Sequence, residues 1–183
     1  MKRLAFFCFL FASTIVKGQD TITYSTLLQS VSELKFTDSL QINAGHSNYK
    51  QLDSSVVKKW FSRLLPSGSH NRLKNRSYSI TGKLTSHANF DLLFVQEEKK
   101  KDDTSNVQVV YLVSTKKDGT YISSLEVAVT GNRKRSFYNI SSWLYKDYQI
   151  VQDNQIIVND KSYGDMTYYK INGGGRFILS SNY

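Results

Sequence analysis

The apolar residues near the start of the chain recur at helical spacing. Leu27, Leu28, Val31 and Leu34 predict a short amphipathic helix within residues 23–35. Leu40 and Ile42, which have polar neighbours, predict a brief extended segment after it.

A second helix is predicted to begin after Asp53, whose side chain can cap it. Its apolar stripe consists of Val56, Val57, Trp60, Phe61 and Leu64. Pro66, the only proline of the chain, and Gly68 are expected to close this helix.

Beyond residue 75 the helical spacing gives way to short runs of alternating, β-branched and aromatic residues. These runs predict strands at 78–84, 90–95, 107–115, 121–129, 143–151, 155–158, 166–171 and 176–179. Residues 97–106 are expected to form a charged loop, and 118–119 and 173–175 to form turns. Because no helix separates the strands, we expect an α+β domain: an antiparallel meander of about seven strands with the two short helices packed on it.

The turn at Asp118 and Gly119 allows two pairings of its flanking strands. A two-residue turn would place Leu112 opposite Leu125. A three-residue loop, 117–119 with Gly119 at positive φ, instead gathers Val109, Tyr111, Val113, Leu125, Val127 and Val129 on one face. Because the second arrangement separates apolar from polar residues better, we expect it.

The first 18 residues have the features of a cleavable signal peptide. Lys2 and Arg3 precede an apolar run over residues 4–16, and Gly18 suits the position before the cleaved bond. The run is shorter than the roughly 20 residues that span a bilayer. A retained anchor and a lipoprotein are the alternatives, but Cys8 lies inside the apolar run and is badly placed for lipidation. We therefore expect a periplasmic or secreted protein that begins at Gln19 and has no transmembrane segment.

Removal of residues 1–18 leaves 19–183, a length that suits a single domain. Cys8 is the only cysteine, so the mature chain can form no internal disulfide and must rely on core packing.

The positive charge of the mature chain is concentrated in one segment. Loss of Lys2, Arg3 and Lys17 reduces the basic residues from 24 to 21, against 15 acidic ones, which leaves a formal charge of +6. Residues 54–90 contain no Asp or Glu but seven basic residues: Lys58, Lys59, Arg63, Arg72, Lys74, Arg76 and Lys83. Such a segment can attract polyanions, and for an exported protein these are acidic glycans and other envelope polyanions rather than nucleic acid.

The residue patterns that signal catalysis or metal binding are missing from the sequence. His46, His70 and His87 have no partners at metal-ligand spacing, and Ser67 lacks the glycine-flanked elbow of a serine nucleophile. Glu97 and Glu98 run into three lysines, which favours a solvated loop over a pair of catalytic carboxylates. Residues 173–175 precede a predicted strand, whereas a phosphate-binding loop precedes a helix. We expect no catalytic residue, metal or cofactor.

Aromatic residues are abundant, and their rings can bind sugars and peptides. Tyr145, Tyr148, Tyr168 and Tyr169 nevertheless fit equally well as ordinary strand residues.

Three groups of residues resemble a loose group of small exported proteins of Bacteroidetes. They are Trp60, Phe61, Leu64, Leu65 and Pro66; Tyr111, Leu112 and Val113 with Lys117, Asp118, Gly119, Ile122 and Leu125; and Tyr168, Ile171, Gly175, Arg176 and Phe177. The resemblance covers most of the mature chain, but these motifs are structural. It implies an exported α+β protein and supplies no catalytic residue.

The sequence therefore favours a non-enzymatic binding or scaffold domain of the cell envelope or the exterior. A hydrolase-type enzyme with dispersed active-site residues and a subunit of an envelope assembly are the alternatives.

Overall fold

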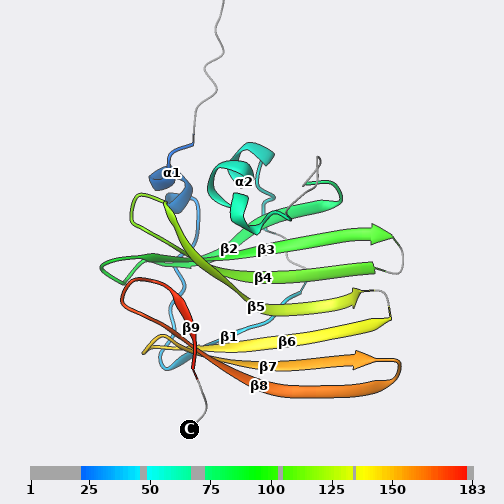
Figure 1. Cartoon of the computed structure of the whole chain (residues 1–183). Coiled ribbons are helices and arrows are strands. Elements are labelled where there is room, and N and C mark those ends of the chain that lie inside the picture. Colours follow the sequence, from blue (N-terminus) through cyan, green and yellow to red (C-terminus); the bar gives the residue numbers. More distant parts are fainter. Residues whose placement is uncertain (1–21, 46–48, 67–72, 103–104, 134, 181–183) are drawn as a thin grey trace, which may run out of the picture.

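The computed structural model describes residues 22–45, 49–66, 73–102, 105–133 and 135–180, and in these segments one antiparallel sheet dominates (Figure 1). Its strands are β1 (Ser39–Ile42), β2 (Arg76–Leu84), β3 (Asp91–Asp102), β4 (Ser105–Thr115), β5 (Tyr121–Arg133), β6 (Ser136–Tyr145), β7 (Gln149–Val158), β8 (Lys161–Ile171) and β9 (Phe177–Leu179). β2 to β9 follow one another in sequence order, and β1 pairs with β6. The predicted antiparallel meander is confirmed. With nine strands in the described residues, the protein is richer in sheet than the α+β class suggests.

Two short helices and one 3₁₀ turn precede the meander: α1 (Tyr24–Gln29), α2 (Ser54–Trp60) and η1 (Ser62–Leu64). Thr23 caps α1, because its hydroxyl accepts a hydrogen bond from the backbone N–H of Thr26 at 3.2 Å. Asp53 is the N-cap residue of α2, as predicted, but its side chain makes no capping hydrogen bond.

The first helix is shorter than predicted. The chain leaves the helix after Gln29, and residues 32–34 run alongside β2 instead. Leu34 donates its backbone N–H to the carbonyl of Lys83 at 2.9 Å, and Lys83 donates to the carbonyl of Ser32 at 3.0 Å. Val31 and Leu34 still pack against the buried core residues, but from positions that follow the helix.

Side chains on the two faces of β2, β3 and β4 belong to two separate cores. The helix-side core contains Leu27 of α1, Val57 of α2, and Leu93, Val95 and Val113 of the sheet. The inner core contains the alternate residues Leu92, Phe94 and Leu112. Alternation along a strand explains why the run 92–95 is buried completely, since each face of the sheet is covered.

The inner core is closed by the far half of the meander. β6 pairs with β5 through residues 136–140 and with β1 through residues 142–145, so β1 occupies the place where β5 and β6 part. Leu144 of β6, Ile150 of β7 and Ile171 of β8 pack into the inner core, as does Ile42 of β1. The opposite face of β6, β7 and β8 is therefore turned outward.

The hairpin between β4 and β5 has the predicted three-residue turn, but its side chains do not lie on the predicted faces of the sheet. Gly119 has φ +89°, and Lys116 donates its backbone N–H to the carbonyl of Thr120 at 2.8 Å. Thr115 pairs with Tyr121, but Ser114 pairs with Ser123, so Ile122 is an extra residue that reverses the facing. Leu112 consequently lies opposite Leu125, and the predicted gathering of Tyr111 with Leu125 on one face is wrong.

Two further predictions about the strands were wrong. Residues 97–106 are not a loop, because β3 continues to Asp102 and β4 begins at Ser105. The run 143–151 is not one strand: β6 ends at Tyr145 and β7 begins at Gln149. Between these strands Asp147 accepts a hydrogen bond from the backbone of Gln149 at 3.2 Å, and Tyr148 has φ +64°, which together reverse the chain.

The turn at residues 173–175 joins β8 to β9, as predicted. In the described part of the chain, no helix has the length and apolar character needed to cross a membrane.

Candidate functional site

A cavity of about 350 Å³ lies between the segment around β1 and the inner face of the sheet. One wall comes from Leu34 and residues 40–45, and Tyr49 adds to it. The opposite wall consists of Thr81 of β2, Phe94 and Gln96 of β3, and Val110 of β4.

Hydrogen bonds fix the wall of the cavity. The side-chain amide of Gln96 donates to the carbonyl of Gly45 at 2.6 Å, which ties the segment after β1 to the centre of β3. The hydroxyl of Thr81 donates to the carbonyl of Phe94 at 3.4 Å. Gln96 is buried, so this contact also satisfies a polar group inside the fold.

The lining of the cavity suits binding by contact and hydrogen bonding rather than acid–base chemistry. Of its twelve described lining residues, Tyr49 alone is ionisable, and that side chain is 52% exposed. Small-molecule sites commonly combine apolar walls with a few polar groups and start at about 300 Å³. The cavity therefore fits a small, uncharged, largely apolar ligand.

The seven basic residues predicted as a polyanion site fall into three groups. Lys58, Lys59, Arg63 and Lys74 are exposed, the first three on α2 and η1. Arg76 and Lys83 lie on β2 and are only partly exposed. Arg72 lies outside the described residues.

Three of these cations have partners within the protein. Arg76 forms an ion pair with Glu97, a carboxylate that is 2% exposed. The ammonium of Lys83 donates to the carbonyl of Leu28 at 2.6 Å. Lys59 donates to the carbonyl of Ile22 at 3.0 Å and lies 4.7 Å from the centre of the Trp60 ring. Of the basic residues predicted to bind polyanions, the exposed ones in the described structure therefore lie on α2, on η1 and before β2.

The prediction that Glu97 lies in a solvated loop was wrong. Its carboxylate is buried on β3 and accepts a hydrogen bond from the hydroxyl of Tyr111 at 3.1 Å, in addition to the ion pair with Arg76. Sequence reasoning missed this because the three lysines that follow suggested a loop.

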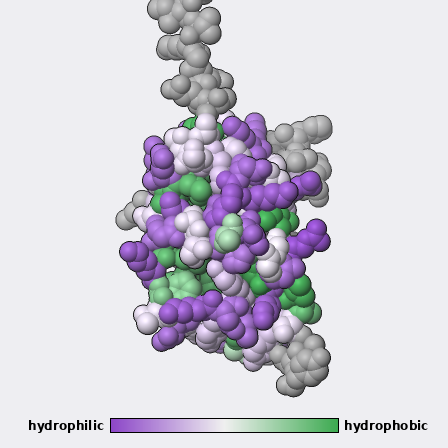
Figure 2. Space-filling view, turned by 90° about the vertical axis from the view of Figure 1, so that its left-hand side faces the viewer, coloured by the Kyte–Doolittle hydropathy of each residue, from purple (hydrophilic) through white to green (hydrophobic). Residues whose placement is uncertain are grey.

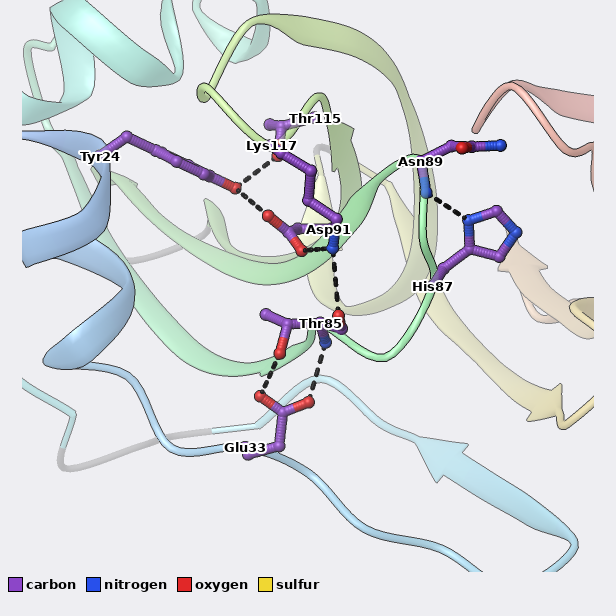
Figure 3. A network of polar contacts seen from close by, with 8 residues as sticks. All are labelled: Tyr24, Glu33, Thr85, His87, Asn89, Asp91, Thr115 and Lys117. Carbon is purple, nitrogen blue, oxygen red and sulfur yellow. Dashed lines mark hydrogen bonds and ion pairs between the residues drawn. The ribbon is translucent and has the colours of Figure 1, made fainter.

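A second buried carboxylate, Asp91, lies at the start of β3 and connects several elements (Figure 3). Lys117 contacts one of its oxygens at 2.6 Å, and the hydroxyl of Tyr24 donates to the other at 3.3 Å. Tyr24 is also 2.5 Å from the hydroxyl of Thr115. Burial is the main cause that raises the pKa of Tyr24 to about 12, and the nearby charge of Asp91 adds to it.

This network joins the first helix to the β4–β5 turn and to the segment before β3. Lys117 also donates to the carbonyl of Thr85 at 3.1 Å, and Glu33 accepts hydrogen bonds from the backbone and the hydroxyl of Thr85 at 2.8 and 2.9 Å. Each of these groups has a partner within the protein, so we interpret the network as structural rather than catalytic.

Of the three histidines, His87 alone lies in the described residues. Its ring stacks on Phe90 at 3.8 Å between ring centres, and its Nδ1 accepts the backbone N–H of Asn89 at 3.1 Å. Among the described residues, no three His, Cys, Asp or Glu side chains are grouped so that they could hold a metal ion.

Figure 2 shows the end of the molecule that lies on the left in Figure 1. Hydrophilic side chains cover most of this end, and the apolar ones appear as separate patches. No large apolar surface is visible there.

Comparison of the chain with protein-family models, with curated proteins and with solved structures gave no match. Fold and site geometry are therefore the observations that bear on function. Sequence reasoning missed the cavity, because its walls come from four separate segments; the one local signal was the polar Gln96 directly after the apolar run 92–95.

Proposed function

We propose that the mature protein is an exported, non-enzymatic binding domain whose ligand is a small, uncharged, largely apolar molecule held beneath β1. The lining of the cavity carries this proposal, because Tyr49 is the one ionisable residue among those described there. The predicted signal peptide supplies the location, either the periplasm or the exterior.

Two features of the cavity support binding. The hydrogen bond from Gln96 to Gly45 holds one wall in place, so the ligand need not order that segment on entry. Phe94, Val110 and Ile42 offer apolar contact, while Thr81 and Gln96 add polar groups that can select orientation. General acid–base catalysis would need a titratable group within reach of the ligand, and Tyr49 is the one such residue in the described lining.

The neutral fluorescent probe N-phenyl-1-naphthylamine tests the cavity in a mature chain that begins at Gln19. We expect saturable binding at one site, and about tenfold weaker binding in Ala44→Phe, whose ring would fill the cavity. Ala88→Phe is the matched control, because Ala88 is exposed and does not line the cavity. Equal binding by both variants would overturn the proposal.

The export part has its own test. Mass spectrometry of the protein from fractionated native cells should find Gln19 as the first residue in a periplasmic or extracellular fraction. Detection of Met1, or of a lipid on Cys8, would show that the signal peptide is not processed as proposed.

A further inference from the structure

Three strands at the far end of the meander present a face that no other described element covers. The pairings of β6, β7 and β8 are regular, so alternate residues share that face. We call it the outer face of β6–β8, and it consists of Phe137, Asn139, Ser141, Trp143, Tyr145, Gln149, Val151, Asp153, Gln155, Ile157, Ser162, Gly164, Met166, Tyr168 and Lys170.

Packing against the inner core shows which side chains of β6, β7 and β8 point away from the core. Leu144, Ile150 and Ile171 have the opposite parity on these strands, and all three are buried in that core. By contrast, every residue of the outer face is exposed or half-buried, and none belongs to a core cluster. The outer face is therefore open to solvent in the described structure.

Three aromatic residues lie together towards one end of the outer face. Trp143 is paired with Val151, and Val151 is paired with Tyr168, so these three side chains form one row across the strands. Tyr145, 39% exposed, lies two residues from Trp143 on the same strand and hence on the same face. At the other end of the row, Gln41 of β1 is paired with Trp143.

Uncharged polar groups lie on the same face of the sheet as the aromatic residues. Three carboxamides belong to the face, Asn139, Gln149 and Gln155, and Gln41 of β1 extends it beside Trp143. Each carboxamide carries both donors and acceptors, the combination that matches sugar hydroxyls. Ser39, Ser141 and Ser162 add hydroxyl groups.

The face is electrically balanced. Asp153 is its one acidic residue and Lys170 its one basic residue. Such a surface has no net attraction for a polyanion, in contrast to the segment 54–90. Its ligand should therefore be neutral.

We propose that the outer face of β6–β8 binds a neutral oligosaccharide chain. Trp143, Tyr145 and Tyr168 offer rings on which the apolar faces of sugar units can stack, and the carboxamides pair with sugar hydroxyls. An open row of this kind suits an extended chain, whereas the cavity beneath β1 suits a small molecule.

Tryptophan fluorescence can test this site directly. Trp60 and Trp143 are the only tryptophans, so a Trp60→Phe background leaves Trp143 as the reporter. The probes are soluble β-glucan, xylan and galactomannan as neutral chains, and polygalacturonate as an acidic one. We expect at least one neutral chain to shift the Trp143 emission saturably, with an affinity that does not depend on salt concentration.

Substitutions locate the site on this face. In affinity electrophoresis with the same polysaccharides, Trp143→Ala and Tyr168→Ala should each weaken binding at least tenfold. Tyr163→Ala is the matched control: Tyr163 is 57% exposed on the same strand, β8, but has the opposite facing, so binding should be unchanged. Melting curves of all three variants establish that each is folded.

Several outcomes would overturn the proposal. These are no response to any neutral chain, binding that Trp143→Ala leaves intact, or binding to polygalacturonate alone. Self-association of the native chain that Trp143→Ala abolishes would assign the face to a second protein copy instead. N-phenyl-1-naphthylamine binding should persist in Trp143→Ala, so failure of this proposal can be distinguished from failure of the cavity.

Discussion

Arg76 on β2 and Glu97 on β3 form an ion pair across two neighbouring strands, with the carboxylate almost completely buried. The hydroxyl of Tyr111 donates to the second oxygen of Glu97 at 3.1 Å. The pair lies on the helix-side face, where Tyr78 is paired with Glu97. Arg76, one of the seven basic residues predicted to bind polyanions, therefore has a structural partner inside the protein.

The first prediction concerns this ion pair. Arg76→Met should reduce the free energy of unfolding by about 3–5 kcal/mol, because it leaves the Glu97 carboxylate buried without its cation. Urea denaturation at neutral pH measures the loss. The double variant Arg76→Met with Glu97→Met should be more stable than Arg76→Met alone, since no uncompensated charge remains. A double variant less stable than the single one would contradict this account.

The second prediction concerns the β4–β5 turn. Gly119 has φ +89°, and a Cβ there would lie 2.6 Å from the ring of Tyr24 and 2.7 Å from that of Trp60. Gly119→Ala should therefore cost about 2 kcal/mol or more, from backbone strain and crowding together. Gly173→Ala is the control, because nothing lies within 4 Å of the added atom. Urea denaturation should show a change of at most about 0.5 kcal/mol for the control; a comparable loss in both variants would rule out the steric explanation.

The third prediction concerns alkaline pH. Tyr24 has a pKa of about 12 in the folded protein, against 10.0 for an ordinary tyrosine. Between these values the unfolded chain has lost this proton while the folded chain retains it, so stability should fall as pH rises from about 10 to 12. Burial also raises the pKa of Tyr78, which acts in the same direction.

Tyr24→Phe isolates the contribution of Tyr24. Urea denaturation at pH 9 and pH 11 should show a smaller loss of stability in the variant than in the native chain. At neutral pH the variant should be about 1–3 kcal/mol less stable, because Asp91 and Thr115 each lose a buried partner. The same pH dependence in both proteins would mean that Tyr24 ionises as in the unfolded chain.

Patterns within short stretches of the sequence predicted the second helix and the turn between β4 and β5. The stripe at Val56 and Val57 indicated α2, and the pair Asp118 and Gly119 indicated a turn with Gly119 at positive φ. The facing of the same hairpin depends on two extra residues, Ile122 and Val127, which no spacing rule reveals. The turn between β7 and β8 did have a signal: Asn159 and Asp160 both adopt positive φ, as these residue types tolerate well.

The candidate sites were harder to predict than the strands. The row of Trp143, Val151 and Tyr168 depends on the register of three strands, and the predicted single strand over 143–151 would have placed Trp143 and Val151 on one strand. The cavity lies between the segment around β1 and residues of β2, β3 and β4, a tertiary arrangement with no counterpart in any one segment. The charge of residues 54–90 was visible in the sequence, but the partners of Arg76 and Lys83 were not.

The last prediction concerns the basic residues that remain exposed: Lys58, Lys59, Arg63 and Lys74. If they form the predicted polyanion site, a chain that begins at Gln19 should bind immobilised heparin at low salt and elute as salt screens the contacts. Replacement of all four by glutamine should lower the eluting salt concentration markedly. Arg76 is left unchanged in this variant, because its loss would destabilise the fold.

A charge-matched control separates a local site from net charge. Lys35, Lys116, Lys146 and Lys161 are exposed lysines outside residues 54–90, and their replacement by glutamine removes the same four charges. Attraction that depends on net charge alone would fall equally in both variants, whereas a local site would be lost in the first variant only. Equal elution of the two variants would therefore refute the polyanion site and leave residues 54–90 as an ordinary solvated surface.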